Sequence, residues 1–245
     1  MKLDQSTLPY LRGEKFSNAL HIHYPYYETI PDRIRLITEI AKDKKVIHLG
    51  CLDHLPLIEQ KVKAGKWLHQ EITKHSKKCL GIDIERETLA YVQEKYGVTN
   101  VILRDMTGEP IPEITAESWD YAVLDELLEH INNPVHYLSE IKKKYSSSIH
   151  KIVITVPNVM SLRIMGFAAN STEVINTDHR YWFTPYTIAK VMHHAGIELD
   201  ELLFANRIKL PIHSLIKQKI IKIFGGQPKY GFQYASSIVA IGKLR

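Results

Sequence analysis

Short apolar segments alternate with longer amphipathic segments through most of the chain. The short segments carry few charges, which is typical of strands that are buried on both faces of a parallel sheet. Five of them cover residues 46–49, 80–84, 101–103, 121–124 and 152–156. This alternation predicts an α/β fold in which helices cover both faces of a mostly parallel sheet.

The segments between these strands contain helix-start signals. Asn133 followed by Pro134 is typical of an N-cap and a first helical residue, and Thr184 followed by Pro185 repeats the pattern. Pro31 is expected to open a helix ahead of the first strand. Two further helices are expected over residues 55–77 and 87–96. An irregular polar stretch is expected over residues 158–181.

Two more β-rich runs, residues 199–205 and 236–241, complete a seven-stranded, Rossmann-like sheet and can pair antiparallel at one edge. An insertion at residues 207–234 separates them. Its segment 212–224 predicts an imperfect amphipathic helix, which suits a substrate lid, a dimer contact or a membrane surface. We divide the chain into an N-terminal cap with the first helix, residues 1–45, and a second unit, residues 46–245.

Composition narrows the class of protein. With 245 residues and 44% hydrophobic content, the chain can bury one substantial core. The net charge of +5 fits an anionic substrate or a membrane surface, and nucleic acid is not expected because no basic run is interleaved with stacking aromatics. Neither a secretion signal nor a run of about 18 apolar residues is found, so a cytoplasmic location is expected. Cys51 and Cys79 fall at opposite edges of the predicted sheet, a geometry that disfavours a disulfide.

Glycine or an acidic residue follows three of the predicted strands, at the edge where α/β folds bind ligands. Gly50 comes directly after the first strand, and a glycine there lets backbone N–H groups approach a ligand. Asp83, at the end of the second strand, can accept hydrogen bonds from both hydroxyls of a ribose. Asp105 can accept one from an adenine amino group, and Met106 can lie against the base. Each acid alone also fits a loop or helix-capping role.

These strand ends resemble those of the class I S-adenosylmethionine-dependent methyltransferases. Residues 125–134, Asp-Glu-Leu-Leu-Glu-His-Ile-Asn-Asn-Pro, are similar to that family's Glu-His-x-x-x-Pro element after the fourth strand. Residues 155–158 and 178–185 are similar to its strand-five exit and its His-x-x-x-Phe-Thr-Pro element. The resemblance covers residues 46–196 and implies S-adenosylmethionine as the cofactor.

The chain departs from the family's usual first motif, an acidic residue followed by Gly-x-Gly-x-Gly. His48, Leu52 and His54 stand where Asp and two glycines are expected, and the spacing from Gly50 to Asp83 is longer than usual. The pattern from His48 to His54, with Trp-Leu-His at residues 67–69, resembles a variant set associated with bacterial surface-polysaccharide and glycan gene clusters. We interpret the departure as this subtype, and loss of cofactor binding is the alternative.

The resemblance implies the following cofactor contacts: His48, Gly50, Cys51, Leu52, Asp83, Ile84, Asp105, Met106, Asp125 and Glu126. His130 and His179 are the candidate catalytic bases, because histidine can accept a proton near neutral pH. Each of these two histidines also fits a purely structural role.

The acidic residues after the fourth strand have an alternative use. Asp125, Glu126 and Glu129 could bind the cationic parts of the cofactor or, together with Asp178, a divalent metal ion. Because Mg²⁺ and Ca²⁺ need several oxygen ligands and no clustered loop supplies them, we expect no metal.

The expected function is O-methylation of a sugar or glycan intermediate. One alternative is methylation of a small non-sugar or lipid-linked metabolite, and another is a non-catalytic interaction module that keeps the fold. The expected partner is a small-molecule or saccharide acceptor, while peripheral membrane contact and a homodimer stay open. Tyr24, Tyr26 and Tyr27 either close over a ligand or pack the N-terminal segment on the sheet.

Overall fold

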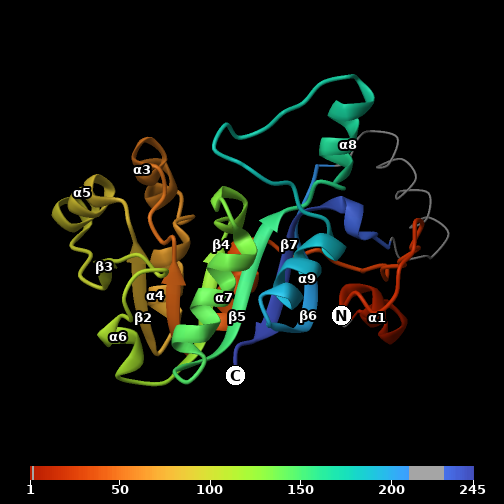
Figure 1. Cartoon of the computed structure of the whole chain (residues 1–245). Helices are drawn as coiled ribbons and strands as arrows, with labels where there is room; N and C mark the ends of the chain where they lie inside the picture. The colour runs from red at the N-terminus through yellow and green to blue at the C-terminus, as the bar shows by residue number, and fades with distance from the viewer. Residues whose placement is uncertain (2, 210–228) are drawn as a thin grey trace.

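The computed structural model describes residues 1, 3–209 and 229–245, and a seven-stranded sheet forms its centre (Figure 1). The strand order is β3-β2-β1-β4-β5-β7-β6. The strands are β1 (Lys45–Leu49), β2 (Lys78–Asp83), β3 (Val101–Leu103), β4 (Trp119–Asp125), β5 (Ile149–Pro157), β6 (Glu198–Arg207) and β7 (Ala235–Lys243). Strands β1 to β5 pair in parallel, and β7 runs antiparallel to both β5 and β6. The predicted seven-stranded α/β architecture is therefore confirmed.

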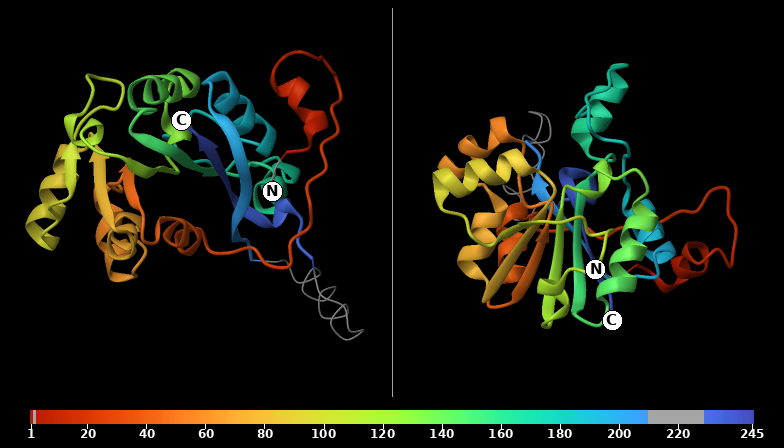
Figure 2. Two further views of the ribbon diagram at one scale, coloured as in Figure 1. Left: turned by 90° about the horizontal axis from the view of Figure 1, so that it is seen from below. Right: turned by 60° about the vertical axis from the view of Figure 1, so that its left-hand side comes forward.

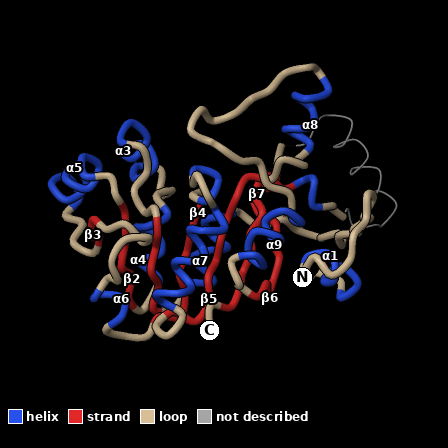
Figure 3. Tube along the Cα trace, in the orientation of Figure 1, coloured by secondary structure: helices blue, strands red, loops and turns tan. Residues whose placement is uncertain are grey.

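Helices lie on both sides of the sheet (Figures 2 and 3). They are α1 (Leu8–Leu11), α2 (Arg33–Ala41), α3 (Leu55–Lys63), α4 (Leu68–His75), α5 (Arg86–Tyr96), α6 (Pro112–Thr115), α7 (Pro134–Tyr145), α8 (Leu162–Ala169) and α9 (Pro185–His194). Short 3-10 helices are η1 (Gln5–Thr7), η2 (Leu128–His130) and η3 (Phe232–Tyr234). Among the described residues, no helix has both the length and the apolar character needed to cross a membrane.

Alternate strand residues contribute to two separate cores, because successive side chains of a strand point to opposite faces. On β1, Val46 packs with residues of α2 and α4, whereas Ile47 belongs to the core formed with α7 and α9. Strand β4 repeats this alternation with Val123 and Ala122. Burial on both faces explains why these strands are almost continuously apolar in sequence.

Three helix predictions need correction. The single helix expected at residues 55–77 is two helices, because Gly65 adopts a left-handed conformation (φ 61°) between α3 and α4. The stretch expected to be irregular contains α8, whose N-cap Ser161 accepts a hydrogen bond from the backbone N–H of Ile164. Pro31 precedes α2 rather than opening it, since the Asp32 side chain caps the helix. By contrast, Asn133 and Thr184 cap α7 and α9 as predicted.

The N-terminal segment passes around the β6 side of the sheet before it reaches α2 (Figure 2). Tyr24 and Tyr27 pack on Phe204 of β6, with ring centroids 6.2 Å and 5.7 Å apart, whereas Tyr26 is exposed. Tyr27 also forms a β-bridge with Tyr230. These contacts favour the packing interpretation of the aromatic stretch. The amphipathic helix predicted at residues 212–224 lies outside the described residues.

Candidate active site

Two adjoining cavities lie at the carboxyl ends of the parallel strands. One has a volume of about 420 Å³ and is lined by Asp105 and Met106, while the other has a volume of about 550 Å³ and is lined by Asp125 and His179. Gly50, Asp83, Ile84, Leu127 and His130 line both cavities. Every residue predicted to bind the cofactor or act as a base lines at least one of them. Their individual roles stay predictions.

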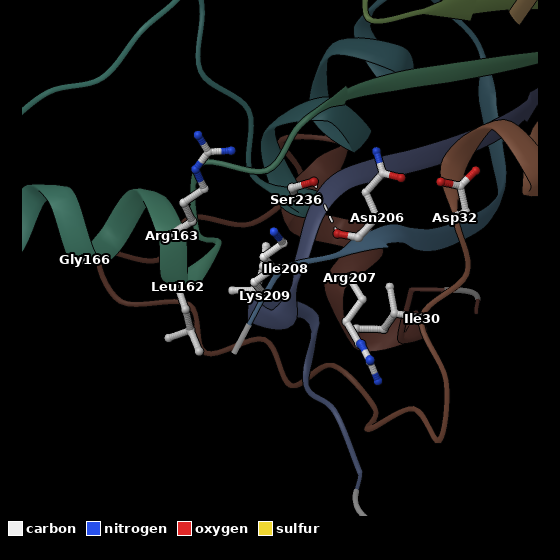
Figure 4. A pocket seen from close by; sticks show the side chains of 10 residues that line it. All are labelled: Ile30, Asp32, Leu162, Arg163, Gly166, Asn206, Arg207, Ile208, Lys209 and Ser236. Atoms are coloured by element: carbon white, nitrogen blue, oxygen red, sulfur yellow. Dashed lines mark hydrogen bonds between the residues drawn. The ribbon is translucent and has the colours of Figure 1, made fainter. Parts of the chain in front are cut away.

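A larger cavity of about 1150 Å³ lies elsewhere, between α8 and the end of β6 (Figure 4). Arg163, Arg207 and Lys209 are among its lining residues, and the first two point in opposite directions. It contains none of the predicted site residues. We do not assign this cavity as the active site, because it lacks those residues and because Arg163 and Arg207 do not point toward a common position.

The turn after β1 depends on Gly50. Its φ of 65° lies in the left-handed region that favours glycine, and its N–H donates to the carbonyl of Ile82 at 2.9 Å. A Cβ atom added there would lie 2.9 Å from Cδ1 of Leu127. The Leu127 side chain therefore packs where a side chain at this position would lie, and both residues line the two cavities.

Asp83 joins the ends of β1 and β2. Its Oδ2 accepts a hydrogen bond from the N–H of Leu52 at 2.8 Å, and its Oδ1 accepts from Ile84 at 2.7 Å and Glu85 at 3.1 Å. The residue is only 7% exposed. Because a carboxylate can accept about four hydrogen bonds, this arrangement still leaves acceptor capacity for a ligand.

The segments after β2 and β3 contribute one polar and two apolar side chains to the smaller cavity. Oδ1 of Asp105 accepts hydrogen bonds from the N–H and the hydroxyl of Thr107, both at 2.8 Å. Met106 is buried, and Ile84, which lines the same cavity, is 70% exposed. An exposed branched side chain facing a cavity is suited to contact with a flat ligand such as a purine.

His48 and Cys51 form an inner wall of the second cavity. The His48 ring stacks on His69 of α4, with centroids 5.5 Å apart, and burial lowers the pKa of His48 well below its usual value. The Cys51 carbonyl accepts a hydrogen bond from Nε1 of Trp67 at 3.0 Å. Burial raises the pKa of the Cys51 thiol well above its usual value, and neither Cys51 nor Cys79 is bridged. Cys51 is therefore a packing residue here rather than a nucleophile.

Space for His69 and Cys51 comes from Gly81 of β2. A Cβ atom at Gly81 would lie 2.7 Å from both Sγ of Cys51 and Cε1 of His69. His69 in turn stacks on His48, so Gly81 makes room for a neighbour of the histidine on β1.

A half-buried ion pair involves an arginine that was not among the residues selected from the sequence. Arg33 of α2 donates a hydrogen bond from Nη1 to Asp125 at the end of β4, and its Nε lies 4.0 Å from Oε1 of Glu126. Thr155 holds the other oxygen of Asp125 at 2.7 Å. Arg33 lies four residues before the buried Ile37 of the same helix. A basic residue on an apolar helix face was the signal that could have identified it.

Glu126 follows β4 in a left-handed backbone conformation, with φ at 49°. Its N–H donates to the hydroxyl of Thr155 at 2.9 Å, which helps to hold this conformation. Burial raises the pKa of Glu126 to about 7. Non-glycine residues in such conformations cost free energy and cluster at functional sites.

Glu129, His130 and His179 come together behind this turn. Glu129 is fully buried, and its Oε1 lies 3.9 Å from Nε2 of His179. The two imidazole rings meet edge to face with centroids 4.7 Å apart. Burial lowers the pKa values of both histidines, and burial together with the nearby Glu126 raises the pKa of Glu129 to about 9.

The loop that carries His179 is fastened to the segment that carries Glu129 and His130. The N–H of Arg180 donates to the carbonyl of Glu129 at 2.8 Å, and its guanidinium donates to the carbonyl of His130. The Tyr181 hydroxyl donates to the carbonyl of Asn132 at 2.7 Å. Residues about 50 positions apart in sequence are thereby held in one cluster.

Comparison with known proteins identifies the family. A family model described as a methyltransferase domain matches residues 21–202, which is most of the chain. A search of curated proteins finds no match.

Several solved structures share the fold. A SAM-dependent methyltransferase from Archaeoglobus fulgidus matches with a TM-score of 0.54 at 17% identity, covering 86% of this chain and 91% of that one. A SAM-dependent methyltransferase from Thermotoga maritima, described as a possible histamine N-methyltransferase, matches with a TM-score of 0.54 at 15% identity, covering 86% and 87%. Magnesium protoporphyrin IX methyltransferase from Synechocystis, with bound SAH, matches with a TM-score of 0.51 at 11% identity, covering 86% and 81%. With the family match over residues 21–202, these likenesses lead to one conclusion: the chain belongs to the methyltransferase domain family and is a methyltransferase.

Proposed function

We propose that this methyltransferase uses S-adenosylmethionine to O-methylate a sugar or glycan intermediate. The observation that carries the proposal is the position of His130, which lines both cavities and therefore faces a ligand in either one. A cofactor in one cavity and an acceptor in the other would meet at this residue. The sugar class of acceptor rests on the variant first motif and its resemblance to enzymes of glycan gene clusters.

The residues at the strand ends fit the cofactor. Gly50 lines both cavities in a left-handed backbone conformation, and Asp83 retains acceptor capacity for ribose hydroxyls. Asp105 and Met106 would contact the adenine, and Ile84 lines the same cavity. The 420 Å³ volume falls within the range of small-molecule sites.

The methionine portion would extend toward the second cavity. His48, Cys51 and Leu52 line that cavity after β1, and the carboxylates of Asp125 and Glu126 line it after β4. The two carboxylates are suited to a cationic amino group, since charge-assisted hydrogen bonds are the strongest of their kind. Arg33 limits the net negative charge of the pair.

When bound, S-adenosylmethionine supplies an electrophilic methyl group on a sulfonium. The chain must then orient an acceptor hydroxyl in line with that methyl group and remove its proton. His130 and His179 have lowered pKa values, so both are neutral near pH 7 and have a lone pair that can accept the proton. The clamped loop of Arg180 holds the two rings in place.

The second candidate function is methylation of an apolar or lipid-linked acceptor. It is favoured by a cavity of about 620 Å³ between the N-terminal segment and α9, which is lined by Tyr10, Phe16, Leu20 and Tyr186. Phe16 is 86% exposed, an unusual state for a phenylalanine without a partner surface.

An acceptor screen tests the proposal. The protein is incubated with methyl-labelled S-adenosylmethionine and panels of nucleotide sugars, oligosaccharides, non-sugar metabolites and lipid-linked sugars. Label transfer to a sugar hydroxyl, reduced in His130→Asn and His179→Asn, is the expected result. Transfer only to non-sugar acceptors would overturn the sugar assignment, and unchanged turnover in both variants would remove histidine from the mechanism.

A further inference from the structure

Glu129 is a buried carboxyl group that approaches Nε2 of His179 at 3.9 Å without forming a hydrogen bond to it. It is 0% exposed, and neither Oε1 nor Oε2 has a hydrogen-bond partner among the described residues. Placing an ionised carboxylate in such a position is expensive unless a cation compensates it. Arg33 is the nearby cation, but it pairs with Asp125 and approaches Glu126 instead.

Two neutral imidazoles lie beside this carboxyl group. One donor atom from each of Glu129, His130 and His179 can be chosen so that all three lie within 4.8 Å of one another. Nδ1 of His179 is also buried and unpartnered within the described structure. Because protein ligands bind transition metals at about 2.0–2.2 Å, donors on opposite sides of one ion are separated by about 4.2 Å, and a small contraction would suffice.

We propose that Glu129, His130 and His179 bind one divalent transition-metal ion. Imidazole nitrogen combined with a single carboxylate suits Mn²⁺, Fe²⁺, Co²⁺, Ni²⁺ or Zn²⁺ better than Mg²⁺ or Ca²⁺, which prefer oxygen ligands. Glu126 is a further carboxyl group beside this cluster. It acts electrostatically on Glu129, and its Oε1 is buried without a hydrogen bond among the described residues, with Nε of Arg33 4.0 Å away. The site is built from two nitrogen ligands and one oxygen ligand.

This ligand set differs from the one considered from sequence. The acidic residues alone did not suggest a metal, because hard cations need several oxygen ligands. His179 lies about 50 positions after Glu129 and His130 in the sequence, and the fold brings the three residues together. Hydrogen bonds from Arg180 to the carbonyls of Glu129 and His130 hold the loop of His179 in place. With two histidine ligands, the site prefers a transition-metal cation of intermediate softness to a hard cation such as Mg²⁺.

The ion would sit where the function proposed above needs a proton removed. Three protein ligands leave coordination positions open, as catalytic metal sites do. A hydroxyl bound to such an ion has a lowered pKa. In this form of the site, which rests on the proposed methyl transfer, His130 and His179 would hold the ion instead of acting as bases. The acceptor hydroxyl would bind at an open coordination position, and its proton would pass to the carboxylate of Glu126, which lines the same cavity.

Cobalt titration tests the site without requiring turnover. The full chain is dialysed against EDTA and then titrated with CoCl₂, and the visible absorption of the bound ion is followed. We expect one Co²⁺ per chain with a micromolar Kd. Binding should weaken at least about tenfold in Glu129→Gln and in His179→Asn, and His75→Asn on the exposed end of α4 should match the wild type.

Controls separate folding and cofactor binding from metal binding. Glu129→Gln keeps the shape of a buried side chain, and His179→Asn replaces a side chain in the loop before α9. Thermal unfolding of each variant shows whether it remains folded. Folded wild-type protein that binds no Co²⁺, or variants that bind it equally well, would overturn the proposal and assign Glu129 as a neutral carboxylic acid. S-adenosylhomocysteine binding by the same metal-free sample shows whether the cofactor site is intact independently.

Discussion

Asp83 Oδ2 accepts a hydrogen bond from the backbone N–H of Leu52 at 2.8 Å, and this contact joins the end of β2 to the turn after β1. The same carboxylate accepts from Ile84 and Glu85, so one side chain shapes both loops that line the two cavities. A carboxylate in this position has a structural task as well as the proposed ribose contact.

Asp83→Asn should weaken the binding of S-adenosylhomocysteine. The amide retains the shape but loses the charge, and hydrogen bonds to charged groups contribute about 1.5–3 kcal/mol. We therefore expect a Kd at least about tenfold higher by calorimetry. Glu113→Gln, an exposed acid in the first turn of α6, is the matched control and should bind like the wild type.

Gly50→Ala and Gly97→Ala form a matched pair. Both glycines have φ near 65°, so each alanine should cost about 1–2 kcal/mol of unfolding free energy. Only Gly50 has a neighbour that the new Cβ would clash with, while nothing lies within 4 Å of a Cβ at Gly97. Denaturant unfolding and cofactor titration should show destabilisation in both variants and weakened binding only in Gly50→Ala. Weakened binding in Gly97→Ala as well would point to a general loss of structure.

Arg33→Met should be destabilising. It leaves Asp125 and Glu126 without their cation. Because all three side chains are only partly buried, we expect a loss smaller than the roughly 3–5 kcal/mol that breaking a fully buried pair costs. Arg35→Met, on the exposed face of the same helix, should change the unfolding free energy little. The double variant Arg33→Met with Asp125→Asn should recover part of the loss, since one uncompensated charge is removed. Equal stability of Arg33→Met and Arg35→Met would contradict the ion pair.

Acid should destabilise the protein through His48 and His69. Burial lowers the pKa of His69 to about 4 and that of His48 well below 6.5, so both are neutral in the folded state. Unfolded histidines bind protons below about pH 6.5. Stability should be full above that pH and fall as the pH drops toward 4, by on the order of 3 kcal/mol for His69 alone.

Among the described residues, no carboxylate acts on His48 or His69 to reverse this effect. The charged neighbour that acts on His48 is Arg33, which disfavours protonation, and His69 contacts Asn100 and Cys79. His69→Gln should flatten the fall in urea midpoint between pH 6.5 and 4, whereas His75→Asn on exposed surface should not. A fall of equal size in His69→Gln would show that other groups cause it.

The sequence predicted the sheet and the cavity edge well, because both depend on local patterns. Apolar runs ending in Gly50, Asp83 and Asp125 identify strands and the edge at which they end. The helix break at Gly65 was missed because apolar spacing continues across it, and only the left-handed backbone separates the two helices.

The charged part of the site was harder to predict, because its partners are far apart in sequence. Arg33 lies on α2 and pairs with Asp125 at the end of β4. Glu129 lies near His179, whose loop has no local sequence pattern that predicts its position. Burial, which decides the protonation of these groups, is a tertiary property. Residue type alone therefore identified Glu129 as an acid but not as a buried one that lacks a hydrogen bond among the described residues.

Binding of the methyl donor in the cavity at Gly50 and Asp83 is measured by calorimetric titration of S-adenosylhomocysteine into the wild type and Asp83→Asn. We expect micromolar binding, about −8 kcal/mol, that is weakened at least about tenfold in the variant and retained in Glu113→Gln. Absence of binding by folded wild-type protein, or equal binding by Asp83→Asn, would contradict this expectation.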